Sequence, residues 1–188
     1  MSELFDLEVR TGLPDALRVL LNDYPRDVWD SQAGFDGLIR FWLERHLLFR
    51  NLLALMQEST QSILDRQGDP LRLTRATGRQ AQILLTQLHG HHQIEDHQYF
   101  PRLTALEPGL QRGFDILDLD HHALDGHLNA LAEATNRLLL AEPIRQNDRA
   151  GALNATLAGF AGFLDRHLVD EEDLVVPILL KHGGDPMI

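Results

Sequence analysis

The sequence predicts an all-α protein, an up-down-up-down four-helix bundle with a short accessory helix at its N-terminus. Apolar residues recur at steps of three and four along most of the 188 residues, and the alternation typical of strands is hard to find. Proline, glycine and polar clusters separate four long periodic segments. Helices joined by short connections pack in alternating directions. We therefore expect residues 1–33 to form an extension and residues 34–188 to form the bundle.

The first two long helices are expected at residues 34–64 and 70–100. The apolar stripe of the first comprises Phe35, Leu38, Trp42, Phe49, Leu53 and Met56. The stripe of the second comprises Ile83, Leu84, Leu88 and Ile94. Asp69 is a suitable N-cap for the second helix, with Pro70 at its first position. Pro101 and the cluster Glu107-Pro108-Gly109 are expected to end it.

The other two long helices are expected at residues 110–140 and 148–183. The seam of the third comprises Phe114, Leu117, Leu124, Leu128, Leu131 and Leu138. The stripe of the fourth comprises Leu153, Leu157, Phe160, Leu164, Leu168 and Leu174. Asp148 can cap the fourth helix, which is expected to end near Gly183.

Ahead of the bundle, residues 13–21 predict a short amphipathic helix that begins with proline. We expect this helix to pack on the bundle or against a partner. A homodimer through this segment is one form that such a partnership can take.

Composition and charge exclude several classes of function. With 44% hydrophobic and 24% charged residues, the chain has the profile of a soluble globular protein. The net charge of -11 argues against binding to nucleic acid or to an anionic membrane surface. No cysteine is present, which excludes disulfides, thiolate metal sites and cysteine nucleophiles. Neither a signal peptide nor a membrane span is recognisable, so a cytoplasmic protein is expected.

Histidine is abundant and clustered, with ten in the chain. One cluster comprises His89, His91, His92 and His97, and another comprises His121, His122 and His127. Clustered imidazoles close to acidic residues indicate a metal site.

Two segments of the chain repeat one pattern, starting at His91 and at His167. Counted from each histidine, both have glutamate at +4 (Glu95 and Glu171), an acid at +5, proline at +10 and leucine at +12. A histidine and a glutamate four residues apart project from one face of a helix, close enough to reach one metal centre or two adjacent ones.

The phase of each pair places it on the apolar side of its helix. In the fourth helix the stripe comprises Phe160, Leu164, His167, Glu171, Leu174 and Ile178, and in the second it comprises Leu84, Leu88, His91 or His92, and Glu95. His46 follows Trp42 on the first helix, and His121 lies between Leu117 and Leu124 on the third. An unpaired carboxylate facing a hydrophobic core costs several kcal/mol, so a positive partner is expected for each glutamate.

A lone inward histidine is more often a hydrogen-bonded core residue than a ligand, and a single His-x-x-x-Glu arises by chance. Two copies in phase with the core, joined by two more inward histidines, favour metal binding instead. Residues expected in other roles are His97, His127 and His182 (solvated), His89 and His122 (surface or supporting), and Asp96 and Glu172 (supporting partners or surface acids). Asp125 is a replacement ligand to consider, four residues after His121.

The pattern resembles the hemerythrin-like, histidine–histidine–glutamate (HHE) cation-binding domain. The resemblance covers residues 34–182, and its strongest signatures are the two repeats, 91–103 and 167–179. Residues 120–125 resemble the histidine segment of the third helix of the family, and residues 41–46 resemble that of the first.

The resemblance implies a ligand set of His46, His91, Glu95, His121, His167 and Glu171, with the two glutamates bridging a pair of irons. A typical hemerythrin has a further histidine one turn before the third-helix ligand, where this chain has Leu117. His92 can supply the missing nitrogen from another helix, which gives five histidines and two carboxylates, enough for two irons with one open position. Without His92, the site holds iron asymmetrically or holds one ion.

Imidazole and carboxylate ligands without sulfur suit iron, manganese or zinc, and a bridged site in a bundle favours iron. The first functional hypothesis is a protein that binds or senses a small molecule such as O2 or NO. A second is an enzyme on the same site that reduces peroxide or NO, or donates iron for repair of metal centres. Repair proteins of the family carry a cysteine-bearing N-terminal region, and this chain has no cysteine, which argues against the repair role. Iron storage or homeostasis, and a bundle that binds no metal, are the remaining hypotheses.

Overall fold

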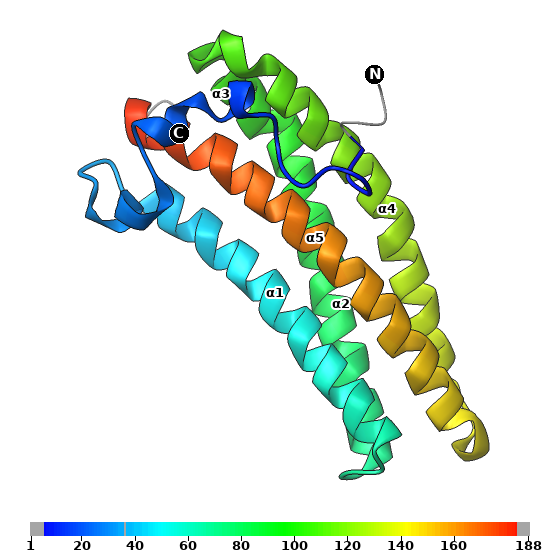
Figure 1. The fold of residues 1–188 in the computed structure, drawn as a ribbon. Coiled ribbons are helices and arrows are strands. Elements are labelled where there is room, and N and C mark those ends of the chain that lie inside the picture. The colour runs from blue at the N-terminus through cyan, green and yellow to red at the C-terminus, as the bar shows by residue number, and fades with distance from the viewer. Residues whose placement is uncertain (1–5, 36, 184–188) are drawn as a thin grey trace. The chain divides into compact units, whose positions relative to one another are not determined.

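The structure, a computed structural model, describes residues 6–35 and 37–183. These residues form helices and turns and include no strand, which confirms the all-α class (Figure 1). The α-helices among them are α1 Gly37–Leu64, α2 Pro70–Ile94, α3 Phe100–Leu106, α4 Gln111–Leu139 and α5 Gln146–His182. None of the helices in this part of the chain has a stretch long and apolar enough to cross a membrane.

The second predicted helix is divided, which makes five α-helices of the expected four. A π-helical turn, Glu95–Tyr99, separates α2 from α3. The prediction that Pro101 ends the helix is wrong, because Pro101 lies in the first turn of α3, where its missing N–H is not needed. The cluster Glu107-Pro108-Gly109 does follow the helix end, since α3 ends at Leu106. The π-helical turn adds one residue to the local repeat. Phe100 and Leu103 are both buried beyond it.

The apolar stripe of α2 differs from the prediction at Ile83 and Ile94, which are both exposed. The buried stripe passes through Leu84 and Leu88 to Glu95, so Ile83 and Ile94 each lie one residue before a buried position. A shift of one residue turns a side chain by about 100° around the helix. Both isoleucines therefore flank the stripe instead of belonging to it.

The helix ends follow local capping rules with one exception. The Leu71 N–H donates to the Asp69 carboxylate at 3.0 Å, so the predicted cap of α2 is confirmed. Gly183 follows α5 with a φ of 79°, a left-handed conformation that glycine adopts without strain. The prediction that Asp148 caps the last helix is wrong, because α5 begins two residues earlier, after a 3₁₀ turn at Pro143–Arg145.

The N-terminal segment forms short 3₁₀ turns where one amphipathic helix was predicted. Two of these turns, Asp15–Leu17 and Val19–Asn22, divide the predicted helix, because Arg18 between them has a φ of -110° and is not helical. A third turn spans Arg26–Ser31. The segment buries Leu13, Leu17 and Trp29 in an apolar core of its own chain. Docking of another protein on this segment stays a prediction.

The chain divides into two compact units. The first, termed the histidine unit, draws its residues from 1–46, 91–123 and 165–188, and the second comprises 47–90 and 124–164. Helices α1 and α4 run from the histidine unit into the second unit, and α2 and α5 run back. Each of these four long helices therefore contributes a segment to both units.

The second unit has an apolar core with a few buried polar links. Its buried side chains include Phe49, Met56, Leu84, Leu131, Leu157 and Phe160. The Thr60 hydroxyl donates to the Asn154 side chain at 3.1 Å, which links α1 to α5. A Cβ at Gly78 would lie 2.9 Å from the Leu139 side chain, so α2 and α4 approach closely there.

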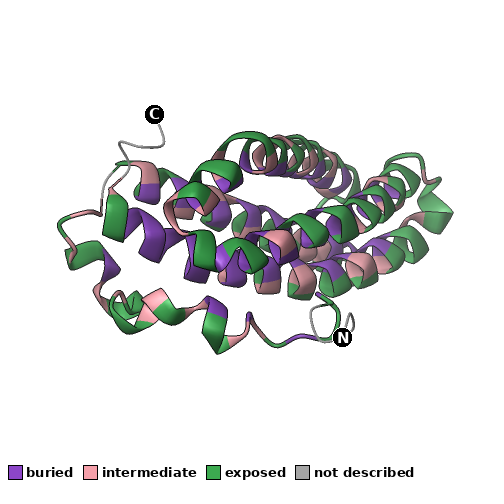
Figure 2. Ribbon diagram, turned by 90° about the horizontal axis from the view of Figure 1, so that it is seen from above, coloured by how far each residue is buried: buried purple, intermediate pink, exposed green. Residues whose placement is uncertain are grey.

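The histidine unit is built around the last turns of α5. Residues 170–180 of this helix are buried without interruption (Figure 2). Trp42, Phe100, Phe114 and Leu117 are buried in the same apolar cluster as the end of α5. Because the helix is buried on every face, its acidic residues have to find their partners inside the protein.

Candidate metal centre

All seven residues predicted as ligands lie in the histidine unit, and the structure brings them together in two groups. One group comprises His92, His121 and His167, and the other comprises His46, His91, Glu95 and Glu171. Within each group the potential ligand atoms lie within 4.8 Å of one another. Every member is buried except His91, which is half-buried.

Four helices and the π-helical turn supply these side chains. His46 comes from α1, His91 and His92 from the end of α2, Glu95 from the start of the π-helical turn, His121 from α4, and His167 and Glu171 from α5. Neighbouring residues on a helix point about 100° apart. His91 and His92 therefore belong to different groups, the first with His46 and the second with His121.

Each glutamate faces both groups, with one carboxylate oxygen toward each. In Glu95, Oε1 lies 2.9 Å from His91 Nε2, and Oε2 lies 3.6 Å from His121 Nε2. In Glu171, Oε1 lies 3.3 Å from His46 Nε2, and Oε2 lies 3.5 Å from His167 Nε2. The two carboxylates thus span the space between the groups.

The donor atoms of the site fit a divalent metal. The Nε2 atoms of His92, His121 and His167, both Glu95 oxygens and Glu171 Oε2 are buried and make no hydrogen bond within the described residues. Buried polar atoms in native proteins are almost always satisfied, and a cation would satisfy these. His46 Nε2 and His91 Nε2 are 3.1 Å apart. Two nitrogens bound to one ion at about 2.1 Å are separated by roughly 3 Å when their angle is near 90°.

Carboxylates hold three of the imidazoles by their other nitrogen. Glu172 contacts His46 Nδ1 at 2.9 Å, Asp96 contacts His121 Nδ1 at 2.7 Å, and Asp120 contacts His167 Nδ1 at 3.2 Å. A carboxylate at Nδ1 fixes the ring and directs the Nε2 lone pair toward a metal. Of the two roles expected for Asp96 and Glu172, the structure shows that of supporting partner. Asp125 is exposed and belongs to neither group.

Negative charge is concentrated in this unit. The buried acids among the described residues are Glu95, Asp120, Asp170, Glu171, Glu172 and Asp173. Arg10 pairs with Asp120 and Asp170, whereas Arg26 pairs with Glu172 and Asp173. Within the part of the chain that the structure describes, Glu95 and Glu171 face histidines and have no arginine partner. These two carboxylates are the ones that a metal would neutralise.

The protonation of the site follows from this burial. Burial, together with the negative charge of Glu171, raises the pKa of Glu95 well above its usual value. Burial lowers the pKa of His91 to about 3 and that of His92 well below its usual value, which keeps both rings neutral. For His46, burial acts in the same direction, but Glu171 and Glu172 outweigh it and raise the pKa to about 9.

Comparison with protein-family models matches residues 37–179 to the hemerythrin HHE cation binding domain. The chain belongs to this family. Searches among curated proteins and among solved structures gave no match. The HHE domain is named for cation binding, and the histidine and glutamate groups of this chain are able to hold a metal ion.

This HHE domain has Leu117 where a typical hemerythrin has a histidine. Leu117 is fully buried in the apolar cluster of the histidine unit. The third nitrogen beside His121 and His167 comes instead from His92, whose ring stacks on that of His121 with centroids 3.9 Å apart. The role of His92 as the replacement for the missing histidine stays a prediction.

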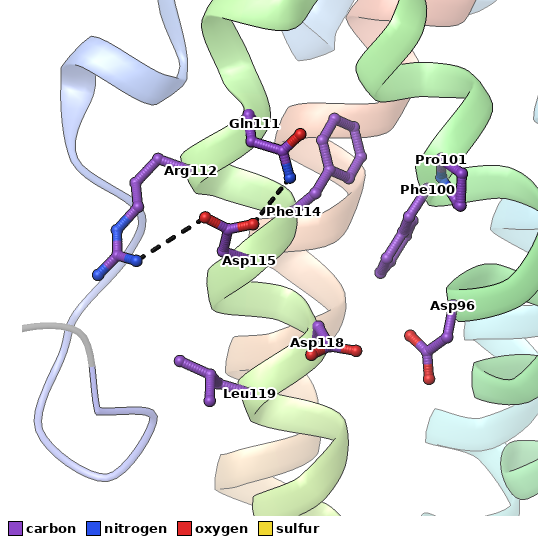
Figure 3. A pocket seen from close by; sticks show the side chains of 9 residues that line it. All are labelled: Asp96, Phe100, Pro101, Gln111, Arg112, Phe114, Asp115, Asp118 and Leu119. Carbon is purple, nitrogen blue, oxygen red and sulfur yellow. Dashed lines mark hydrogen bonds and ion pairs between the residues drawn. The ribbon is translucent and has the colours of Figure 1, made fainter.

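A surface pocket of about 420 Å³ adjoins the site. Asp96 and Phe100 line it on one side and Asp118 on another, and the two aspartates face each other across it (Figure 3). Asp96 also bonds His121, and the ring of Phe100 stacks on His121 with centroids 5.6 Å apart. The side chains of Asp96 and Phe100 thus lie between the pocket and His121, one of the proposed metal ligands.

The remaining histidines lie outside both groups. His89, His97, His122 and His182 are exposed, and His127 is half-buried with its ring 4.4 Å from that of Phe163. His97 bonds the Gln93 carbonyl at 2.8 Å, and His182 pairs with Glu107 at 2.6 Å.

Several supporting residues of this HHE domain were not found from the sequence. Trp42 donates its indole N–H to Glu171, and Arg10, Arg26, Asp120 and Asp170 form the ion pairs described above. One signal was available, since residues 170–173 are four consecutive acids in an otherwise apolar helix end. Such a run is usually a solvated face, and only the folded chain shows that it is buried.

Proposed function

We propose that this HHE domain is an up-down-up-down bundle that holds two irons, bridged by Glu95 and Glu171. One ion would be held by His46 and His91 and the other by His92, His121 and His167. The protein then binds or senses a small molecule such as O2 or NO. Manganese and zinc are alternative metals for the same donors.

The observation that carries the proposal is the placement of the four carboxylate oxygens. Each glutamate has one oxygen within 2.9 to 3.6 Å of a histidine nitrogen of each group. A carboxylate that serves one ion has no need of this arrangement, whereas a bridging carboxylate requires it. Two divalent ions would also take over the neutralisation of Glu171, which falls to the protonated His46 ring when no metal is bound.

His92, His121 and His167 would offer three nitrogens to one ion, and His46 and His91 would offer two to the other. The second ion would therefore have the more open coordination. Bound iron would supply the position at which a small ligand coordinates. The protein contributes burial, since His46, Glu95 and Glu171 are almost fully excluded from solvent. This burial argues against a bulky substrate and favours a diatomic molecule or a small oxidant as the ligand.

The test is to load the protein anaerobically with ferrous iron, remove the excess and measure iron atoms per chain. A value near two, with a visible band that appears on adding O2 or NO and disappears on degassing, is the expected result. A value near one contradicts the bridged pair. A value near zero, with manganese and zinc also not bound, contradicts metal binding altogether.

A redox enzyme on the same site is the second candidate, favoured by an oxidisable aromatic pair. Trp42, which bonds Glu171, lies edge-on to Tyr99 with ring centroids 4.9 Å apart, and Tyr99 is half-buried. The pair leads from the site toward the surface. Steady consumption of peroxide or NO with a reductant present favours the enzyme, and binding without turnover favours the sensor. Iron storage predicts uptake well above two irons per chain.

A further inference from the structure

The N-terminal segment carries two arginines that reach the carboxylates behind the proposed ligands. Arg10 and Arg26 lie before residue 37, where the match to the HHE family begins. Each pairs with a carboxylate that in turn contacts the Nδ1 atom of a histidine in the site. The segment is therefore connected to the metal centre through polar contacts, in addition to its apolar packing.

The first connection runs from Arg10 through Asp120 to His167. Arg10 Nη1 donates to Asp120 Oδ1 at 2.7 Å, and Nη2 donates to Oδ2 of the same carboxylate. Asp120 Oδ2 lies 3.2 Å from His167 Nδ1. Arg10 Nε also donates to Asp170 at 2.9 Å, and the side chains of all these residues are almost fully buried. A two-point contact of this kind fixes the plane of the carboxylate.

The second connection runs from Arg26 through Glu172 to His46. Arg26 Nη1 donates to Glu172 Oε2 at 2.8 Å, and Glu172 Oε1 lies 2.9 Å from His46 Nδ1. Arg26 also donates to Asp173 at 2.6 Å and to the Val169 carbonyl at 2.8 Å. Its guanidinium is thus held at three points along α5.

The two connections end at different histidine groups, since His167 belongs to one and His46 to the other. We propose that Arg10 and Arg26 are positioning residues for the metal centre, through which the N-terminal segment sets the orientation of a histidine in each half of the site. Undocking the segment would release both carboxylates and loosen both halves together. This inference rests on the proposed metal binding. It assigns the regulation of metal binding to Arg10 and Arg26, which lie outside the region matched to the family.

The arginines could also act by neutralising buried acids without orienting any metal ligand. A control variant at Arg18 distinguishes this role from the proposed one. Arg18 also pairs with Asp173, at 3.5 Å, and its other carboxylate partner is Asp15 on the surface. Neither acid contacts a histidine of the site. Arg18→Met and Arg26→Met therefore remove the same charge from the same end of α5, and only the second removes a contact to a carboxylate that orients a ligand.

The experiment is cobalt(II) titration of the full chain and of both variants, with affinity and the visible absorption of bound cobalt as readouts. Loss of a group that orients a metal ligand typically weakens affinity by about 10- to 100-fold. We expect that loss, with a changed cobalt spectrum, for Arg26→Met and wild-type behaviour for Arg18→Met. Arg10→Lys keeps the buried charge and loses the two-point contact, so it should change the spectrum as well.

Equal affinity and identical spectra for Arg26→Met and Arg18→Met, with normal binding by the wild type, would overturn this inference and leave the proposed function standing. Failure of the wild type to bind cobalt or iron would overturn both. Arg26 is 39% exposed, so its replacement leaves the core intact even if Arg10 variants do not fold.

Discussion

His92 offers the sharpest test of the proposed site, because the proposal gives it the role of a histidine that a typical hemerythrin has on another helix. Its Nε2 is buried without a hydrogen-bond partner in the described structure, and it lies within 4.8 Å of the ligand nitrogens of His121 and His167. The substitution His92→Leu keeps most of the side-chain volume and removes the nitrogen. His97→Leu is the matched control, on the adjoining π-helical turn, exposed and outside both groups.

The expected loss of metal affinity in His92→Leu follows from the number of ligand atoms around the ion. Structural zinc sites with four ligands bind with about 10–16 kcal/mol, or roughly 3 kcal/mol for each ligand. Loss of one ligand should therefore weaken the affinity of that ion on the order of 100-fold. In His92→Leu, the affected ion keeps His121, His167 and the two carboxylate oxygens. The other ion keeps all of its donors.

The assay is equilibrium dialysis against graded ferrous iron under anaerobic conditions, with iron atoms per chain counted at each concentration. The wild type and His97→Leu should fill two sites over one range of concentration. His92→Leu should fill one site in that range and the second only at iron concentrations about two orders of magnitude higher. Two sites of unchanged affinity in His92→Leu would refute the assignment of His92 as a ligand.

Three further predictions concern the bridging carboxylates, the pH dependence and the indole donor. Glu95→Ala and Glu171→Ala should each release most of the metal, because each substitution removes one oxygen ligand from both ions. Elemental analysis after gel filtration measures the metal that remains. Retention of two metals by either variant would show that the replaced glutamate does not bridge. Metal affinity should rise with pH up to about 9, because the pKa of His46, raised to about 9 by Glu171 and Glu172, leaves this ring protonated at neutral pH and the metal has to displace that proton. Calorimetry in buffers of different ionisation enthalpy measures the protons released, and an affinity that is flat between pH 6 and 9 would contradict this assignment. Trp42→Phe should keep the aromatic packing and remove the hydrogen-bond donor to Glu171. The visible spectrum of bound cobalt should therefore change while the metal count stays at two. An unchanged spectrum would mean that the indole does not influence the Glu171 carboxylate.

Local rules accounted for most of the helices and failed where the helix geometry itself changed. The Asp69 cap and the end of the last helix at Gly183 were predicted, because capping depends on residues a few positions apart. The interruption at Glu95–Tyr99 was not predicted, since a π-helical turn has no strong sequence signature and Pro101 suggested an ordinary helix end. Ile83 and Ile94 were misplaced because each lies one residue before a buried position, Leu84 and Glu95.

The sequence by itself determined the all-α class, the family and the seven side chains that converge, because the phase of a histidine or glutamate on a helix is set by neighbours three and four residues away. The division of His91 and His92 between two groups was decided by the tertiary structure, since it depends on which helices lie on either side of α2. The tertiary structure also decided which acids and arginines support the proposed ligands. Arg10 and Asp120 are separated by 110 residues, and nothing local to either indicates the pairing. Four consecutive acids look like a solvated face, but the folded chain buries all four and pairs three of them, Asp170, Glu172 and Asp173, with arginines of the N-terminal segment.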